Sequence, residues 1–332
     1  MEPLVFCFGE ILLRMSPVLG GQWLADAQMP VYVGGAEANV ASALARWGLP
    51  VVYGTAMPDH YLSREIENYL QGLGVRPSVV WTGARLGTYY LPQGSDLQHA
   101  GVIYDRAYSS FAGLEPGMID WDTVLKGITW FHFSAISPAL TAPVAEVCRE
   151  ALEVATRLGI TISVDLNYRA KLWQYGASPT EVMPDLVSNC DVVMGNLWAA
   201  ESLLGIPIDP FVHASASYLE HARITSEEIM RRFPRCRYVA NTFRFELEGL
   251  KYFASLAGKD SMSVSREYFT PTVVDKVGSG DCFMGGLIFG LCQGWTPGNV
   301  IEFAAAAAFG KLQELGDSTR QTVAQIMNRY AQ

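Results

Sequence analysis

A glycine-rich turn ends in the carboxylate of Asp281, directly before an apolar stretch typical of a buried helix. A helix N-terminus carries unpaired amides and the positive end of the helix dipole. Glycine lets those amides approach an anion closely, so Gly278, Ser279 and Gly280 are expected to cradle a phosphate. The turn is not a G-x-x-x-x-G-K-[ST] loop, and Phe283 replaces the third glycine of G-x-G-x-x-G.

Asp281 itself has two interpretations. Aspartate is well suited to capping a helix N-terminus. Alternatively, the carboxylate is a base beside a bound phosphoryl group and accepts the proton of a substrate hydroxyl as that oxygen attacks. Phosphoryl transfer needs amides and Mg²⁺ for the phosphates and one carboxylate for the hydroxyl, and the turn supplies the first and the last.

The elements that position this turn follow a strand–helix rhythm. Strands alternating with helices predict an α/β fold in which a mostly parallel sheet is flanked by helices. A helix is expected over about 142–158, Val273 and Val274 are expected to end a strand or an extended segment, and residues 208–234 are expected to form an excursion between core elements. Ligands bind beyond the carboxyl ends of such strands. These ends are Gly34-Gly35, Asp165 to Arg169, Gly195-Asn196 and the turn at Gly278.

The amino-acid composition and net charge limit the kinds of ligand that the protein is expected to bind. The chain has 332 residues, of which 50% are hydrophobic and 17% charged, and its net charge is −9. This balance argues against binding nucleic acid or an anionic membrane surface, although a small anion needs only a local positive pocket. No apolar run reaches the roughly 18–20 residues that span a bilayer, and the expected location is the cytoplasm. The five histidines lack metal-ligand spacing, and the six cysteines are expected to be buried free thiols.

Two long motifs resemble one family. The stretch DKVGSGDCFMGG (275–286) resembles the carboxyl-proximal signature of ribokinase-like (PfkB-type) carbohydrate kinases, and GGAEANVASALARWG (34–48) resembles their amino-proximal one. The resemblance covers nearly the whole chain. It implies a single kinase domain over 1–332 with ATP as phosphoryl donor, Mg²⁺, and a small β-sheet lid from strands at about 11–33 and 87–112. A homo-oligomer formed through the lid is a further expectation.

Further stretches are similar to the 2-keto-3-deoxygluconate kinases of that family. They are VIYDRAYSSFAGLEP, FHFSAISPAL and VDLNYRAKLW. A sugar acid carries a carboxylate, which a guanidinium holds through paired charge-assisted bonds, so Arg106 and Arg169 are expected to face the sugar. Tyr89 and Tyr104 are expected to contact the carbon chain of the sugar with their ring faces and hydroxyls. Gly34 has no side chain, so the sugar hydroxyls can approach the backbone closely there. Asp165 and Asn167 either orient Arg169, contact phosphates or are structural.

The chain departs from the family near the metal and the nucleotide. The usual N-x-x-E has Asn196 but Ala199 in place of the acid, with Glu201 two residues further on, so no metal ligand is assigned. Mg²⁺ keeps several waters and needs few protein ligands, so this loss does not exclude activity. The glycine expected after YVANTF is missing. The candidate nucleotide-binding residues are Asn196, Asn241, Thr242 and Arg244.

The sequence thus favours an ATP-dependent kinase for the terminal primary hydroxyl of a sugar acid, with 2-keto-3-deoxygluconate as the leading substrate. A kinase for a neutral sugar such as fructose or ribose is the alternative within the class. A sugar-sensing binding protein with weak transfer is the alternative outside it. The reason to consider a binding protein is that Ala199 replaces the acid of the family's N-x-x-E motif. The intact glycine turn with Asp281 argues against it.

Overall fold

A large twisted sheet forms the centre of the molecule. The computed structural model describes residues 2–18, 23–92, 101–208 and 218–331. Strands run in the order β13-β12-β11-β10-β9-β8-β1-β4-β5, parallel from β11 to β5, and β14 pairs with β12. The strands are β1 (Val5–Phe8), β4 (Val51–Met57), β5 (Arg76–Trp81), β8 (Trp130–Ser134), β9 (Thr161–Asp165), β10 (Val192–Gly195), β11 (Tyr238–Leu247), β12 (Gly249–Ala257), β13 (Met262–Val264) and β14 (Tyr268–Thr270).

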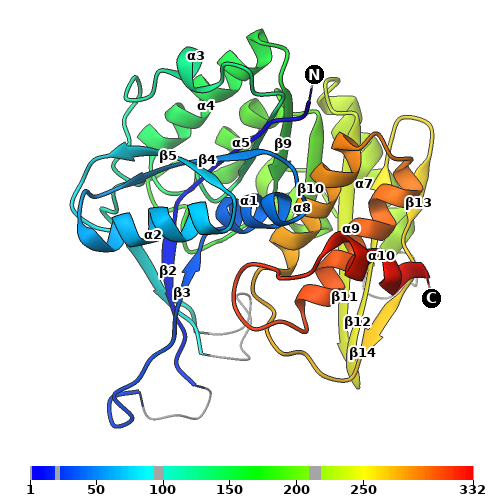
Figure 1. Cartoon of the computed structure of the whole chain (residues 1–332). Helices are drawn as coiled ribbons and strands as arrows, with labels where there is room; N and C mark the ends of the chain where they lie inside the picture. Colours follow the sequence, from blue (N-terminus) through cyan, green and yellow to red (C-terminus); the bar gives the residue numbers. More distant parts are fainter. Residues whose placement is uncertain (1, 19–22, 93–100, 209–217, 332) are drawn as a thin grey trace.

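Helices cover both faces of this sheet, as the sequence predicts (Figure 1). One face carries α1 (Ala36–Arg46), α2 (Tyr61–Gly72), α8 (Ser279–Cys292), α9 (Pro297–Lys311) and α10 (Val323–Ala331). The other carries α3 (Trp121–Val124), α4 (Ala142–Arg157), α5 (Pro179–Val187), α6 (Leu197–Leu204) and α7 (Tyr218–Arg232). In the described ranges, no helix is long and apolar enough to cross a bilayer. The six cysteines carry free thiols, and only Cys292 is less than fully buried.

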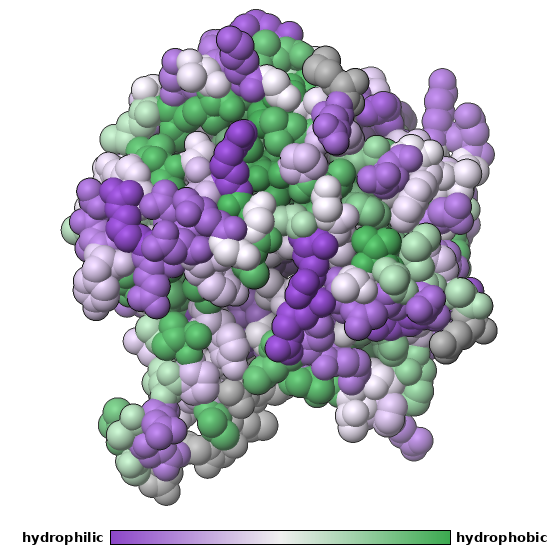
Figure 2. All heavy atoms as spheres, viewed as in Figure 1, coloured by the Kyte–Doolittle hydropathy of each residue, from purple (hydrophilic) through white to green (hydrophobic). Residues whose placement is uncertain are grey.

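A separate small sheet extends away from the large one, toward the lower left of Figure 1. Its strands are β2 (Leu12–Met15), β3 (Val31–Gly34), β6 (Gly87–Tyr90) and β7 (Ile103–Asp105), in the order β3-β2-β6-β7. The prediction of a second, small sheet is confirmed. Figure 2 shows apolar atoms on this lower-left lobe, and Val18, Leu24 and Ile103 are more than half exposed there. Its action as a lid and the assembly of copies through it stay predictions.

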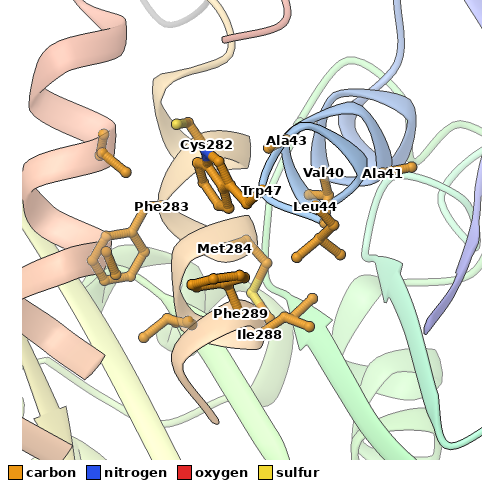
Figure 3. Packing of buried hydrophobic residues seen from close by; sticks show 14 of the residues in the cluster. Val40, Ala41, Ala43, Leu44, Trp47, Cys282, Phe283, Met284, Ile288 and Phe289 are labelled. Carbon is orange, nitrogen blue, oxygen red and sulfur yellow. The ribbon is translucent and has the colours of Figure 1, made fainter. Parts of the chain in front are cut away.

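The glycines of α8 allow it to pack between two neighbouring helices (Figure 3). A Cβ atom on Gly285 would lie 3.2 Å from the Cβ of Ala43 in α1. A Cβ on Gly286 would lie 2.6 Å from the Cα of Ala304 in α9. The ring of Trp47 closes the gap between these helices, and its Nε1 donates a 3.0 Å hydrogen bond to the Gln321 carbonyl. Close helix contact therefore fixes where α8 begins.

The structure defines two predicted segments more closely. β14 ends at Thr270, and Val273 and Val274 follow it outside any strand, where the N–H of Val274 donates to the carbonyl of Leu312 at 2.8 Å. The excursion at 208–234 contains the 15-residue helix α7, while residues 209–217 lie outside the described ranges. The buried side of α7 includes the polar side chains of Thr225 and Ser226, so its sequence lacks an apolar stripe.

We predict that Gly286→Ala destabilises the protein by about 1–3 kcal/mol, the usual cost of overpacking a filled core. The reason is the 2.6 Å approach of the added Cβ to the backbone of α9. Urea denaturation of both proteins measures the change. Gly298→Ala in the first turn of α9 is the control, because nothing lies within 4 Å of its added Cβ, and about 0.4–1 kcal/mol of stabilisation is expected. Equal stability of Gly286→Ala and wild type would contradict the packing argument.

Candidate active site

The turn at Gly278 leaves its amides free at the start of α8. Gly278 is the N-cap with φ +77°, and a Cβ there would lie 1.9 Å from the carbonyl oxygen of Asp317. Ser279 Oγ donates to the Ala308 carbonyl at 3.0 Å, so its side chain ties α8 to α9. Gly280 is exposed with open space beside it. In the described part of the chain no acceptor meets the N–H groups of residues 279–281, and this arrangement suits an anion.

Asp281 is the third residue of α8, not its cap, and its carboxylate bonds to the neighbouring helix. Asn39 Nδ2 in α1 donates to Asp281 Oδ2 at 2.7 Å. Ser318 Oγ donates to Asn39 Oδ1 at 3.2 Å, which orients the amide so that its NH₂ group faces the carboxylate. The structure therefore adds Asn39 to the site. Its signal was present in the GGAEANVA motif, but nothing in the sequence shows which side chain it meets.

Burial raises the pKa of Asp281 to about 7. This value already includes a raising effect from the negative charge of Glu37 and lowering effects from the Asn39 hydrogen bond and the charge of Arg169. The side chain remains partly exposed, so a ligand can reach it. A carboxyl group with this pKa exchanges its proton near neutral pH, which suits a general base.

Glu37 fixes the start of α1 over the strand ends. Its Oε1 accepts hydrogen bonds from the N–H of Ser134 at 2.8 Å and from Ser134 Oγ at 2.6 Å. A Cβ on Gly9 would lie 2.0 Å from Glu37 Oε2, so the glycine after β1 makes room for this carboxylate. Burial raises the pKa of Glu37, and the bonds to Ser134 oppose that shift. The contact helps to position Asn39, which lies two residues further along α1.

Arg169 is near enough to Asp281 for its charge to act on that carboxyl group, and in the described residues it has no carboxylate partner of its own. It is half-buried, donates to its neighbour's carbonyl, Tyr168 O, at 3.1 Å, and within the described ranges no carboxylate lies within 4 Å. Its charge acts on both Asp281 and Asp165. Asp165 ends β9, is buried, and has its pKa raised by burial and by the charge of Asp281. Asn167 follows the strand and is half-buried.

Arg106, in contrast, is already paired. Its Nε donates to Glu10 Oε2 at 2.7 Å, and both side chains are at least nine-tenths buried. Ser109 Oγ donates to the other oxygen of Glu10. Arg106 follows β7 of the small sheet and Glu10 follows β1 of the large sheet, so this ion pair joins the two sheets. The guanidinium charge is thus balanced before any ligand binds.

A second buried charge cluster holds the small sheet to the glycine turn. Arg14 of β2 donates to Asp317 Oδ1 at 2.7 Å and to Asp275 Oδ2 at 2.9 Å. Tyr89 of β6 donates to Asp317 Oδ2 at 3.2 Å. A Cβ on Gly34 would lie 2.6 Å from this same oxygen, so only glycine fits there. The Tyr104 ring lies 6.3 Å from the Tyr89 ring and is half-buried.

The residues expected to bind the nucleotide come from α6 and β11, and two of them already make hydrogen bonds within the protein. Asn196 caps α6, its Oδ1 accepting from the Ala199 N–H at 2.8 Å. Asn241 and Thr242 lie inside β11 rather than after it, because β11 pairs with β12 as far as Leu247. Asn241 Nδ2 donates to Ser226 Oγ of α7 at 3.3 Å. The side chain of Arg244, also in β11, is half-buried.

The described residues contain no group of three acidic, histidine or cysteine side chains able to hold a metal ion. Ala199 is buried, and Glu201 is exposed on α6 with its Oε1 accepting from the Ile208 N–H at 3.4 Å. Mg²⁺ that is coordinated mainly by phosphate oxygens and water does not need such a group of protein ligands. The donor set therefore fits Mg²⁺ only as a partner of bound phosphates.

Comparison with known proteins gives consistent matches over nearly the full length. A family model described as pfkB family carbohydrate kinase matches residues 2–230 and 252–323. The 2-dehydro-3-deoxygalactonokinase of Haloferax volcanii is 29% identical over 313 residues, 93% of this chain and 91% of the other. Probable fructokinase-4 of Arabidopsis thaliana is 27% identical, covering 86% and 82%. The crystal structure of 2-dehydro-3-deoxygluconokinase from Thermotoga maritima has a TM-score of 0.90 at 32% identity and covers 100% of both chains.

We predict that Asn39→Ala raises the pKa of the Asp281 carboxyl above about 7, because the amide N–H stabilises the charged form. A ¹³C NMR titration of the aspartate carboxyls measures it, with Asp281→Asn identifying the signal. Ser318→Ala is the control, since it leaves the Asn39 contact in place and a much smaller shift is expected. An unchanged pKa in Asn39→Ala would mean that this hydrogen bond does not tune the carboxylate.

Proposed function

The chain belongs to the pfkB family of carbohydrate kinases, and we propose that it transfers the γ-phosphoryl group of ATP to a sugar acid. The acceptor is the terminal primary hydroxyl, and 2-keto-3-deoxygluconate is the leading substrate. The observation that carries the proposal is Arg169, a half-buried guanidinium whose charge acts on Asp281 and which has no carboxylate within 4 Å in the described residues. Such a group is able to bind the carboxylate of the acceptor.

The two relatives named for 2-dehydro-3-deoxy sugar acids support this substrate class. Both named substrates carry a carboxylate at one end and a primary hydroxyl at the other. Asp281 and Arg169 would engage these two ends, so the carboxylate contact would place the hydroxyl at the base. The gluconate and galactonate forms share both groups, and an assay has to compare them directly.

The chemical step uses Asp281 as the base. The carboxylate accepts the hydroxyl proton while the sugar oxygen forms a bond to the γ-phosphorus. The bond from that phosphorus to the bridging oxygen breaks, and ADP leaves with the electron pair. The free N–H groups at the start of α8 and the positive end of its dipole stabilise the charge on the transferred group. Mg²⁺ bound to the phosphates would neutralise part of their charge.

The small sheet would cover the sugar during this step. The Tyr89 hydroxyl of β6 lies near Gly34 of β3, and the Tyr104 ring of β7 lies 6.3 Å from the Tyr89 ring. Closing a site in this way excludes water, which would otherwise compete as phosphoryl acceptor. The lid role expected from the sequence is therefore part of the proposal.

A neutral sugar such as fructose or ribose remains the second candidate because Glu10 already balances Arg106. Only one of the two expected guanidinium groups is then free for an acid. A sugar-sensing binding protein is less well supported, since the open amides and a base with a pKa of about 7 suit transfer. A coupled ADP-release assay over 2-keto-3-deoxygluconate, its galacto isomer, fructose and ribose separates these candidates. No turnover with any of them would overturn the kinase proposal.

We predict that Asp281→Asn retains the fold and lowers kcat by about 10²-fold or more, the scale of losing general-base catalysis. The fold is kept because Gly278 caps α8 and an asparagine oxygen still accepts from Asn39. Steady-state ADP release and a thermal melt measure both properties. A stable variant with near-native turnover would remove Asp281 from the mechanism.

Arg169→Lys tests the substrate class. A lysine keeps the charge but not the planar paired contact, so kcat/KM for the keto-deoxy acid should fall about ten- to a hundredfold, as expected for 1.5–3 kcal/mol. Activity on fructose should change little, since fructose has no carboxylate. Arg64→Lys on the exposed face of α2 is the control and should affect neither. Equal losses on both substrates would assign Arg169 to the phosphates or the fold, favouring a neutral sugar.

A further inference from the structure

A lysine side chain is buried directly beneath the anion-binding turn. Lys311 is the last residue of α9 and is 0% exposed. A Cβ placed on Gly278 would lie 3.4 Å from Lys311 Cε, so the end of this side chain lies against the turn. Its Nζ donates to the Glu314 carbonyl at 3.0 Å. In the described part of the chain no carboxylate lies within 4 Å of Nζ, so the ammonium is not held by a close ion pair.

The fully buried charges around Lys311 balance one another, and the half-buried carboxylate of Glu314, which accepts from Thr319 Oγ1 and the Arg320 N–H, adds a further negative charge nearby. Arg14 and Lys311 are positive, whereas Asp275 and Asp317 are negative and both bond to Arg14. Asp275 also fixes the backbone: its Oδ1 accepts from the Val277 N–H at 3.0 Å, and its Oδ2 accepts from the Gly316 N–H at 3.2 Å. Removing Lys311 would leave two carboxylates against one guanidinium beneath a turn that has to accept an anion.

We propose that Lys311 is a tethered monovalent cation that keeps the phosphate-binding turn electrically neutral. Its ammonium fills the place that a free cation of similar size, such as K⁺ or NH₄⁺, would otherwise have to occupy. This assignment rests on the proposed function only in taking the bound anion to be a nucleotide phosphate. Lys311 lies below the turn, so it positions the phosphates without contacting the sugar. The kinase is therefore independent of added monovalent cations.

The burial of Lys311 argues against a purely space-filling role. Burial lowers the pKa of its ammonium, and the charges of Asp275 and Asp317 oppose that shift. An unpaired buried ammonium is costly, and a long apolar side chain would fill the same volume without this cost. The position of the charge next to Gly278, rather than the volume of the side chain, explains why a lysine is present.

The test compares wild type with Lys311→Ala in K⁺, NH₄⁺, Na⁺ and choline chlorides at one ionic strength. ADP affinity measured by calorimetry and kcat from ADP release are the two readouts. Wild type should be the same in all four salts. Lys311→Ala in choline should bind ADP about tenfold or more weakly, the scale of losing one charged partner, and K⁺ or NH₄⁺ should restore a large part of that loss.

Arg329→Met is the matched control for damage to the end of α9. Arg329 of α10 donates to the Ala306 carbonyl of that helix at 2.9 Å. This variant should lose thermal stability without any dependence on the added cation. A folded Lys311→Ala variant with native ADP affinity in choline, or with a loss that no cation reverses, would overturn the proposal.

If Lys311→Ala does not fold, the salt dependence of the wild-type protein tests the proposal. Stimulation of wild-type ADP binding or turnover by K⁺ over choline, by severalfold, would show that a free cation still acts beneath the turn and would overturn the assignment. Equal values in both salts support it. ADP binding needs no sugar, so a wrong acceptor sugar leaves this test unaffected, and a wrong role for Lys311 leaves the acceptor assay unaffected.

Discussion

The contact between Gly278 and the carbonyl oxygen of Asp317 is the constraint on which the site depends. No side chain fits between them, and the left-handed backbone of Gly278 turns the chain so that α8 begins there. Asp317 is itself held by Arg14 and Tyr89 from the small sheet. The open amides, the Asp281 carboxylate and the strands of the small sheet are therefore fixed relative to one point. The glycines inside α8 extend this constraint into the core, since they set the depth of the helix between α1 and α9.

The proposed role of Asp281 as a base opposes its contribution to stability. Its pKa in the folded protein is about 7, well above the ordinary value of an aspartate. Between those two pH values the folded state holds a proton that the unfolded state has released. The contribution of this group to folding free energy is therefore complete in acid and is lost as pH rises through about 7. The ionised form that the proposed mechanism requires is thus the form in which the folded protein is less stable.

The sequence predicts what depends on neighbours along the chain. The helix expected over about 142–158 is α4, Ala142–Arg157, and the turn with Asp281 lies at a helix start as its glycines indicate. Contacts between distant segments were not predictable: Glu10 and Arg106 are 96 residues apart, and Asn39 meets Asp281 across 242. Nothing in the sequence shows that Lys311 lies beneath the Gly278 turn, because periodicity reports burial but not which loop lies above a side chain. α7 was missed because its buried side is partly polar.

The Glu10–Arg106 ion pair has a consequence for how this chain diverges. Each member is buried and is the other's counterion, so replacing one alone leaves an uncompensated charge in the interior. Descendants of this sequence can lose the pair readily only by changing both positions, or by passing through a destabilised intermediate. Because Arg106 follows the small sheet and Glu10 the large one, recombination between homologues is limited in the same way: a transplanted small sheet has to bring a partner that suits the recipient's first strand.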